Sequence, residues 1–310
     1  MLLNTSFSTY GRVDMNKDIN IKRTGAPETM ELREKKGVTY LVFPKLEKID
    51  FIDHLFSTRL GGVSKGCYSE MNLSYTRGDE KEAVDENYMR IADVMGHGRT
   101  LNDFVSTFQT HTTNVKVITE KDRGKGPAKS RDYTDIDGLI TNVPGIILST
   151  FHADCPPIYF VDPVNKAIGL SHSGWKGTKG EIAARTIDKM QENYGTKASD
   201  VICAIGPSIC GDCYEIGEDV ASQFSENYTE DELSNNKILV KYPEGKYRLY
   251  LWNAIKLTLL KKGVKEENIV ITDVCTRCNP DLLFSHRIHH DDRGNLAAFL
   301  SIRKDEKTNS

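Results

Sequence analysis

The chain has 310 residues, of which 38% are hydrophobic and 27% are charged, a composition typical of soluble globular proteins. Its 41 basic and 44 acidic residues give a formal net charge of −3, and no block of like charge dominates. This balance argues against a nucleic-acid partner. No apolar run approaches the roughly 20 residues that a membrane-spanning helix needs, so we expect no membrane partner either.

The cysteine content does not indicate a disulfide framework, because an odd number of cysteines cannot pair completely. Met1, Leu2 and Leu3 are followed at once by polar residues, so we expect no secretory signal. We therefore expect a cytoplasmic location, where thiols stay reduced and are free for metal binding or chemistry. The seven cysteines are Cys67, Cys155, Cys203, Cys210, Cys213, Cys275 and Cys278.

Residues 1–36 show no sustained periodicity and are rich in Asn, Thr, Lys and Glu. We predict that they form a poorly ordered N-terminal extension or peripheral arm. The pattern changes at Val38, and the rest of the chain contains no repeat, low-complexity tract or linker. We therefore predict a single folded domain over residues 37–304.

Hydrophobic periodicity and turn residues predict the elements of this domain in chain order. Its first part is predicted to contain two strands and a helix, at residues 38–43, 52–58 and 80–95. Six short strands are predicted next, at residues 104–109, 114–119, 138–141, 145–150, 157–161 and 167–172. The last part is predicted to mix helices with strands, at residues 177–194, 201–205, 218–228, 249–262, 268–272 and 296–302. One α+β domain with many strands is the simplest interpretation.

Three residues with metal-binding side chains lie at or just beyond predicted strand ends, namely His111, Cys155 and His172. Two imidazoles and one thiolate form a natural ligand set for zinc, and they leave one coordination position open for water or substrate, as catalytic sites do. The three are separated by 44 and 17 residues, and this spacing matches no short metal motif. From the residues alone, a lone histidine is more often a surface or hydrogen-bonded side chain, and a lone cysteine is more often a small buried hydrophobic residue.

A second metal interpretation comes from two Cys-x-x-Cys pairs, Cys210-Gly-Asp-Cys213 and Cys275-Thr-Arg-Cys278. Four cysteines in such pairs can hold a structural zinc in a closed site. The 62 positions from Cys213 to Cys275 are much longer than in an ordinary zinc ribbon. The alternative is that Cys213 and Cys275 simply pack in the core.

Charged residues near these motifs are further candidates for a functional role. Arg59 stands beside a double-glycine turn and Arg287 follows Ser-His, so either could meet an anion, although a solvated arginine is the default for both. Asp137 and Asp154 could orient ligands or carry protons, and the alternative is that they cap turns.

Taken together, several segments resemble the laccase-domain family, also called the multicopper polyphenol oxidase family. They occur in the order of that family and cover about residues 38–302. The sequence departs from the pattern of the family at two places: residues 112–114 are not glycine-rich, and Pro156 follows Cys155 where Val or Ile is common. The resembling segments are residues 57–64, 71–73, 109–111, 137–141, 153–157, 172–177, 205–209, 213–215 and 284–287.

The resemblance implies a laccase-domain-like catalytic domain over residues 37–304, with two packed mixed β-sheets flanked by helices. It implies a zinc centre at His111, Cys155 and His172, with copper as the alternative metal that the family name suggests. The implied activities are phosphorolysis of adenosine, inosine, guanosine and methylthioadenosine, and deamination of adenosine. Purine nucleosides and phosphate are then the expected partners of a monomer or small homo-oligomer.

For phosphorolysis, Arg59, Lys176 and Arg287 are the candidates for binding phosphate and substrate, and Asp154 is a candidate for protonating the purine. A cysteine hydrolase with Cys155 as nucleophile and His111 or His172 as base is an alternative. A copper-dependent phenol oxidase is a further alternative, although eight scattered histidines are few for a multicopper site. A zinc-stabilised binding module that uses the two cysteine pairs is the non-enzymatic alternative.

Overall fold

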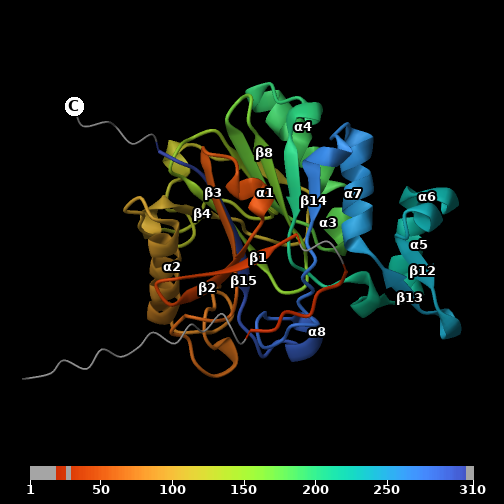
Figure 1. Cartoon of the computed structure of the whole chain (residues 1–310), viewed down its shortest axis with the longest axis horizontal. Coiled ribbons are helices and arrows are strands. Elements are labelled where there is room, and N and C mark those ends of the chain that lie inside the picture. The colour runs from red at the N-terminus through yellow and green to blue at the C-terminus, as the bar shows by residue number, and fades with distance from the viewer. Residues whose placement is uncertain (1–18, 26–28, 305–310) are drawn as a thin grey trace, which may run out of the picture.

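The computed structural model describes residues 19–25 and 29–304, and it contains two large mixed sheets packed against each other and flanked by helices (Figure 1). The predicted fold class is therefore confirmed. The first sheet has six strands, of which only β4 and β7 pair in parallel. Its order is β1 (Glu31–Lys35), β2 (Val38–Val42), β3 (Ile52–Ser57), β15 (Leu296–Ile302), β7 (Ile147–His152) and β4 (Phe104–Ser106).

The second sheet also has six strands, and β10 with β14 and β5 with β6 are its parallel pairs. The central strands of both sheets are buried along most of their length, which explains why they read as continuous apolar runs. The order of the second sheet is β14 (Ile269–Ile271), β10 (Ile202–Ile205), β8 (Pro157–Asp162), β9 (Ala167–His172), β6 (Gly138–Thr141) and β5 (Val115–Val117).

The core between the sheets is formed by apolar side chains of both, such as Phe56 and Leu148 from the first and Leu170 from the second. Within this core, the hydroxyl of Tyr159 on β8 donates a hydrogen bond to the carbonyl of Leu55 on β3 at 3.0 Å. The two sheets are therefore joined by a buried polar contact as well as by apolar packing.

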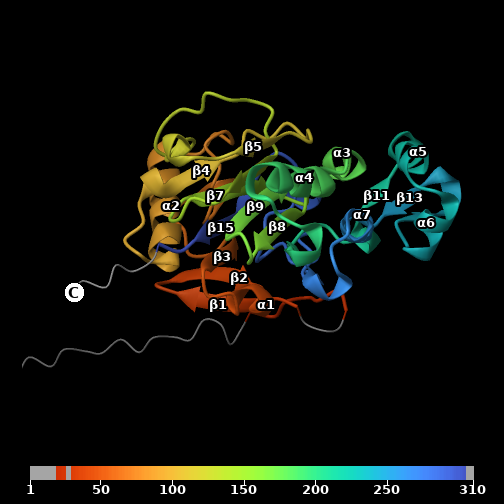
Figure 2. The ribbon, with the colours of Figure 1, turned by 90° about the horizontal axis from the view of Figure 1, so that it is seen from above.

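Helices cover the outer faces of both sheets (Figure 2). Helix α2 (Lys81–Met95) packs its apolar stripe on the first sheet, while α4 (Ile182–Tyr194) and α7 (Leu251–Lys262) cover the second. A lateral lobe contains a three-stranded sheet, ordered β11 (Glu215–Ile216), β13 (Tyr247–Leu249) and β12 (Leu239–Lys241), and the helices α5 (Glu218–Asn227) and α6 (Glu230–Asn235). The remaining short helices are α1 (Pro44–Glu47), α3 (Trp175–Lys179) and α8 (His286–His289).

Part of the predicted N-terminal extension is folded. Strand β1 pairs with β2, so a domain boundary at residue 36 would cut a β-hairpin. The backbone of Thr24 donates to the carbonyl of Asp273, and the backbone of Met30 donates to the Asp273 carboxylate. Residues 1–18 and 26–28 lie outside the described residues.

Two other local predictions differ from the structure. The helix predicted over residues 177–194 is two helices, α3 and α4, because Glu181 takes a left-handed conformation with a φ of 59° between them. The three-stranded sheet and α6 were not predicted, because their strands have at most three residues and show little periodicity. No helix within residues 19–25 and 29–304 is long and apolar enough to cross a membrane.

The aromatic cluster under α2 provides a test of this packing. Phe299 of β15 is fully buried, with ring centroids 5.6 Å from Phe104 and 6.2 Å from Tyr88. Phe299→Ala is expected to lower the free energy of unfolding by about 3–5 kcal/mol, because it leaves a cavity. Urea denaturation measures this, with the exposed Val164→Ala as control, expected to stay within about 0.5 kcal/mol of the parent protein. Equal stability of the two variants would contradict the packing.

Candidate metal centre

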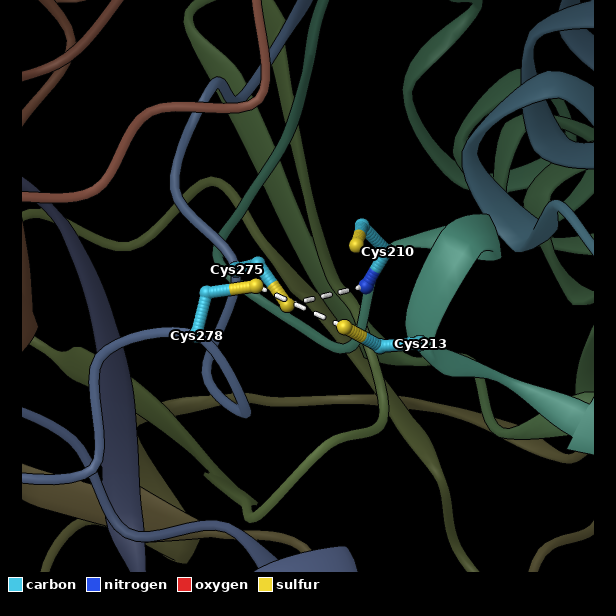
Figure 3. Close-up of side chains that lie close together, drawn as sticks. All are labelled: Cys210, Cys213, Cys275 and Cys278. Atoms are coloured by element: carbon cyan, nitrogen blue, oxygen red, sulfur yellow. Dashed lines mark hydrogen bonds between the residues drawn. The ribbon is translucent and has the colours of Figure 1, made fainter.

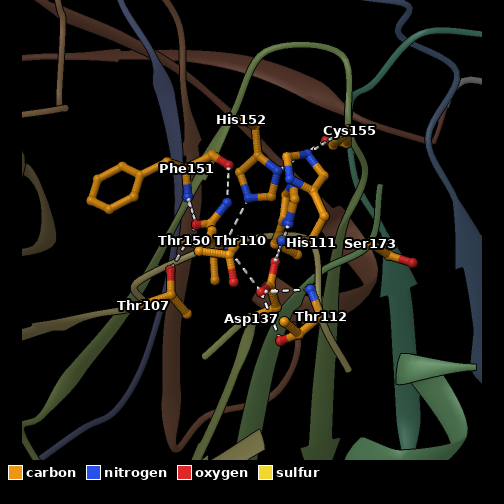
Figure 4. A network of polar contacts seen from close by, with 12 residues as sticks. Thr107, Thr110, His111, Thr112, Asp137, Thr150, Phe151, His152, Cys155 and Ser173 are labelled. Atoms are coloured by element: carbon orange, nitrogen blue, oxygen red, sulfur yellow. Dashed lines mark hydrogen bonds and ion pairs between the residues drawn. The ribbon is translucent and has the colours of Figure 1, made fainter. Parts of the chain in front are cut away.

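The three residues predicted as metal ligands converge in the structure. His172 is the last residue of β9, Cys155 lies in the turn between β7 and β8, and His111 lies in the loop after β4. Their ligand atoms all lie within 4.8 Å of one another, and the Cys155 sulfur is 4.0 Å from Nε2 of His111 (Figure 4). Residues far apart in the chain thus form one three-donor group at the ends of strands.

The carboxylate of Asp137 lies beside the donor group and contacts two of its residues, His111 and His172 (Figure 4). It is fully buried and accepts backbone N–H bonds from Thr110, His111 and Thr112 at 3.0–3.1 Å. It also lies 2.8 Å from Nδ1 of His172. Because a carboxylate accepts, Nδ1 carries the proton, and Nε2 is the nitrogen that His172 offers to a metal.

Charge interactions within the group favour the ligand forms. Burial by itself would raise the pKa of the Cys155 thiol, but the neighbouring His172 and His111 outweigh burial and lower this pKa to about 6. Burial would lower the pKa of His172, but the Cys155 sulfur and the Asp137 carboxylate raise it to about 9. Cys155 and His172 therefore form a thiolate–imidazolium pair, in which a metal cation would replace the proton of His172.

Gly174 has no side chain, and two of these donors occupy the space that a side chain would fill. A Cβ atom at this position would lie 2.8 Å from the His111 ring and 3.0 Å from the Cys155 sulfur. Any other residue would therefore displace two donors at once. Gly174 also precedes α3, so the chain turns away from the site directly after His172.

His152 was not predicted as part of this site. It is buried at the end of β7, with Nε2 2.7 Å from the hydroxyl of Thr150 and Nδ1 2.9 Å from the carbonyl of Cys155. Burial, and then the charge of His172, lower its pKa well below the usual value. His152 is therefore a neutral support for the Cys155 backbone, and both its nitrogens are engaged. Its place three residues before Cys155 was the only signal in the sequence.

Two cavities meet at the donor group and share His111, Ala153 and Cys155 in their walls. We call the first, of about 450 Å³, the arginine cavity, because Arg77, Arg131 and Arg293 line it. We call the second, of about 400 Å³, the aromatic cavity, because Trp175 and Tyr214 line it, together with the aliphatic Leu251. The donor group therefore lies between a cationic space and a largely apolar one.

Arg293 is the most constrained cation of the arginine cavity. Only 9% of it is exposed, and its Nε–H has no hydrogen-bond partner among the described residues. Burial, and then the positive charge of Arg77, lower its pKa to about 10. Arg77 also donates to the carbonyl of Arg293 at 3.4 Å, so its guanidinium lies against the Arg293 backbone, and both residues line the same cavity. Two adjacent guanidinium groups with an unused donor form a favourable site for an anion.

The structure brings two of the four charged residues that were predicted to act in phosphorolysis to the aromatic cavity. Arg287 lines this cavity, and its guanidinium lies 5.4 Å from the Tyr214 ring. Asp154 also lines it and has a φ of 86°. One carboxylate oxygen of Asp154 accepts from the hydroxyl of Thr276 at 2.6 Å, and the other accepts from the backbone of Arg287 at 2.7 Å.

The structure does not bring Arg59 or Lys176 to either cavity. Arg59 donates to the carbonyls of Ser69 and Pro280 at 3.0 and 2.9 Å and stacks on the Phe284 ring, so it joins three loops. Lys176 is exposed, with Nζ 5.6 Å from the ring of the preceding tryptophan. The double glycine that suggested Arg59 belongs to a backbone turn, in which Gly61 has a φ of 85°, and Lys176 lies on α3.

Together, these features define a single-domain α+β protein with a three-donor group that could hold a metal ion between two cavities, an arrangement suited to a metal-dependent enzyme. The model of the family described as multi-copper polyphenol oxidoreductase laccase matches residues 53–303, and the chain belongs to this family.

Relatives of the chain have names that refer to purine nucleosides. Purine nucleoside phosphorylase YlmD of Bacillus subtilis is 32% identical over 253 residues, which cover 80% of this chain and 88% of that protein. Adenosine deaminase RL5 of an unknown prokaryotic organism is 34% identical over 251 residues, covering 78% and 93%. The crystal structure of YlmD from Geobacillus stearothermophilus has a TM-score of 0.80 and 32% identity, and the match covers 90% of this chain and all of that one.

Replacing the buried carboxylate tests its role in the metal centre. Asp137→Asn is expected to weaken zinc binding by about 10- to 100-fold, because the amide no longer fixes the tautomer of His172. Competition with a chromophoric chelator measures the affinity. Asp135→Asn is the matched control, because Asp135 is exposed and contacts the same loop through the Thr110 hydroxyl at 2.6 Å. Equal weakening in both variants would contradict the assignment.

The glycine that faces the donors gives a second, steric test. Gly174→Ala is expected to weaken zinc binding on the order of tenfold or more, because the new methyl group displaces His111 and Cys155. Gly177→Ala is the control, because its Cβ would make only contacts of 3.5 Å or longer. Circular dichroism should remain unchanged in both variants. Normal zinc affinity in Gly174→Ala would show that the donors do not converge as described.

Proposed function

We propose that the chain is a zinc-dependent purine nucleoside enzyme. Its reactions are phosphorolysis of adenosine, inosine, guanosine and methylthioadenosine, and hydrolytic deamination of adenosine. The observation that carries the proposal is the convergence of His111, Cys155 and His172 between a cavity lined by arginines and a cavity lined by aromatic rings. The relatives named purine nucleoside phosphorylase and adenosine deaminase support the substrate class.

The donor set fits zinc, because imidazole nitrogen and thiolate sulfur are the ligands that zinc takes in proteins. Nε2 of His111, the sulfur of Cys155 and Nε2 of His172 would hold it. When bound, zinc supplies Lewis acidity to a substrate or water oxygen. Asp137 keeps His172 in the ligand tautomer, and His152 holds the Cys155 backbone.

Phosphate binding is best supported in the arginine cavity. In phosphorolysis a phosphate oxygen bonds to C1′ of the ribose while the glycosidic bond breaks and the purine leaves with the bonding electrons. Arg77 and Arg293 can hold the phosphate through charge-assisted hydrogen bonds, and the unpartnered Nε–H of Arg293 supplies one donor. We therefore prefer this pair to Arg59 and Lys176 as the phosphate site.

The purine base is best supported in the aromatic cavity. Trp175 and Tyr214 offer ring faces for stacking, and Arg287 can donate to acceptor atoms at the edge of the base. Both oxygens of Asp154 accept hydrogen bonds, which favours a positioning role for this residue over proton donation. C1′ and C6 lie on different sides of a purine nucleoside, so phosphorolysis and deamination need different placements of the substrate beside the donors.

Nucleoside turnover by zinc-loaded protein tests the proposal directly. Hypoxanthine release from inosine is expected only in the presence of phosphate, because phosphate is the nucleophile. Cys155→Ala is expected to lower the rate by about 100-fold or more, because it removes a metal ligand. Chromatography of the reaction mixture measures base and ribose 1-phosphate together. Zinc-loaded protein with no release above the Cys155→Ala variant would reject phosphorolysis.

The KM for phosphate, measured in the same assay, tests where the phosphate binds. Arg77→Ala should raise the KM for phosphate about tenfold or more, while the phosphate-independent deamination of adenosine changes little. Lys176→Ala is the matched cation control and should leave the KM for phosphate unchanged. A raised KM for phosphate in Lys176→Ala, with no change in Arg77→Ala, would instead support the phosphate site that was predicted from the sequence.

A cysteine hydrolase is the second candidate function, because the thiolate–imidazolium pair of Cys155 and His172, with Asp137 behind the imidazole, resembles a nucleophile, its base and an orienting acid. The dependence of activity on a bound metal distinguishes the two candidate functions. A hydrolase would be active without metal and inactivated by iodoacetamide, whereas a zinc enzyme would lose activity with its metal.

Multicopper oxidation is less well supported than either candidate. All eight histidines are among the described residues, and only His111 and His172 contribute to a group that could hold a metal. A multicopper centre needs several more imidazole ligands than this site offers. Copper therefore remains only an alternative occupant of the same three-donor site.

A further inference from the structure

The two Cys-x-x-Cys pairs meet in a second group of possible metal ligands, which shares no residue with the centre described above (Figure 3). The sulfur atoms of Cys210, Cys213, Cys275 and Cys278 all lie within 4.8 Å of one another. Cys210 and Cys275 are buried, while Cys213 and Cys278 are partly exposed. The 62 positions that separate the pairs in sequence are therefore no obstacle, because the fold brings both turns together.

Backbone pairing explains why the two turns meet. Ser208, after β10, forms an isolated parallel bridge with Cys275, after β14, and these two strands are neighbours in the second sheet. The backbone of Thr276 donates to the carbonyl of Ser208 at 3.0 Å. The four-cysteine group thus lies where two parallel strands end at the same edge of the sheet.

We propose that these four cysteines bind one zinc ion in a closed, structural tetrathiolate site. Tetrahedral zinc with Zn–S bonds of about 2.3 Å places its sulfur atoms about 3.8 Å apart. The sulfur–sulfur separation of 3.4 Å between Cys213 and Cys278 is close to this value, and it is far longer than a disulfide bond. All four thiols are free.

The surroundings of the group suit a metal–thiolate centre rather than four packed thiols. The backbone N–H of Cys210 donates to the sulfur of Cys275 at 3.2 Å. The guanidinium of Arg277 donates to the sulfur of Cys213 at 3.5 Å. Four thiolates around Zn²⁺ carry a net charge of −2, so a cation and an N–H donor pointing at sulfur are the contacts such a site needs.

The short separations also select the kind of metal centre. In an iron–sulfur cluster the four cysteines are divided among two or four iron atoms, which holds at least some of their sulfurs farther apart than around a single ion. A four-sulfur group this compact fits one tetrahedral ion, and zinc is the usual occupant of such sites. With four protein ligands no position remains for substrate, so the role is structural.

The site connects directly to the aromatic cavity. The backbone of Ile209, next to Cys210, donates to the carbonyl of Asp154 at 3.0 Å. Thr276, between Cys275 and Cys278, donates its hydroxyl to the Asp154 carboxylate. A metal that joins the two turns therefore holds Asp154, the neighbour of Cys155, from both sides. This inference does not depend on the reaction that the chain catalyses.

Zinc counting by elemental analysis tests the proposal on the full chain, purified under reducing conditions. The parent protein is expected to bind two zinc ions, Cys155→Ala one, Cys278→Ser one, and the double variant none. Cys67→Ser is the matched control, because Cys67 is exposed and distant in sequence from both pairs, and it should retain two. If the three-donor centre bound no zinc, the parent protein and Cys155→Ala would each bind one ion and Cys278→Ser none. If the four-cysteine group bound no zinc, the parent protein and Cys278→Ser would each bind one ion and Cys155→Ala none, so the two proposals are tested separately.

Two further measurements keep the test valid if Cys278→Ser does not fold. X-ray absorption of Cys155→Ala should show zinc with four sulfur neighbours at about 2.3 Å. Thermal unfolding of Cys155→Ala should shift down by several degrees when a chelator removes its remaining zinc, because the metal stabilises only the folded state. Three results would overturn the proposal. They are an unchanged zinc content in folded Cys278→Ser, iron in place of zinc at this site, and a disulfide between Cys213 and Cys278 that persists under reducing conditions.

Discussion

The buried carboxylate of Asp137 is the contact on which the three-donor centre depends. Strands β6 and β9 pair with Gly138 opposite Ser171, so the residues next to them, Asp137 and His172, lie side by side at the same sheet edge. The carboxylate also accepts hydrogen bonds from the backbone of the His111 loop, which connects β4 at the edge of the first sheet to β5 of the second. The strand register therefore places one ionised carboxylate where it can orient two of the ligand residues. The hydrogen bonds that it accepts offset the free-energy cost of burying its charge.

Sequence reasoning predicted the fold class and the ligands for different reasons. Periodicity and turn residues revealed most strands, because the buried central strands are mostly apolar and are bounded by turn residues. The ligands were found by resemblance, because separations of 44 and 17 residues carry no geometric information. Arg77 and Arg293 escaped prediction, since they are 216 positions apart and only folding brings them together. Strand β1 was missed because its exposed, charged residues do not alternate clearly.

The two cavities differ in the physical requirement that each imposes on a ligand. On the arginine side, Arg293 has given up most of its contact with water and lies beside another cation, so an anion would relieve a cost already present in the protein. On the aromatic side, Trp175 and Tyr214 present flat surfaces whose burial by a base is favourable without a fixed charge. The two substrates of phosphorolysis meet these two requirements, because a nucleoside carries a planar base and phosphate is an anion.

The two cysteine-containing groups differ in their access to ligands, and hydrogen bonds to Asp154 connect them. The three-donor centre is open, and His111 is exposed, so a ligand can approach it. The four-cysteine group is closed and lies on two turns that both contact Asp154. Asp154 has a left-handed backbone, which costs free energy unless its surroundings hold it in place. Cys155 is the next residue, so restraint of the two turns also limits the movement of the sulfur that the open centre requires.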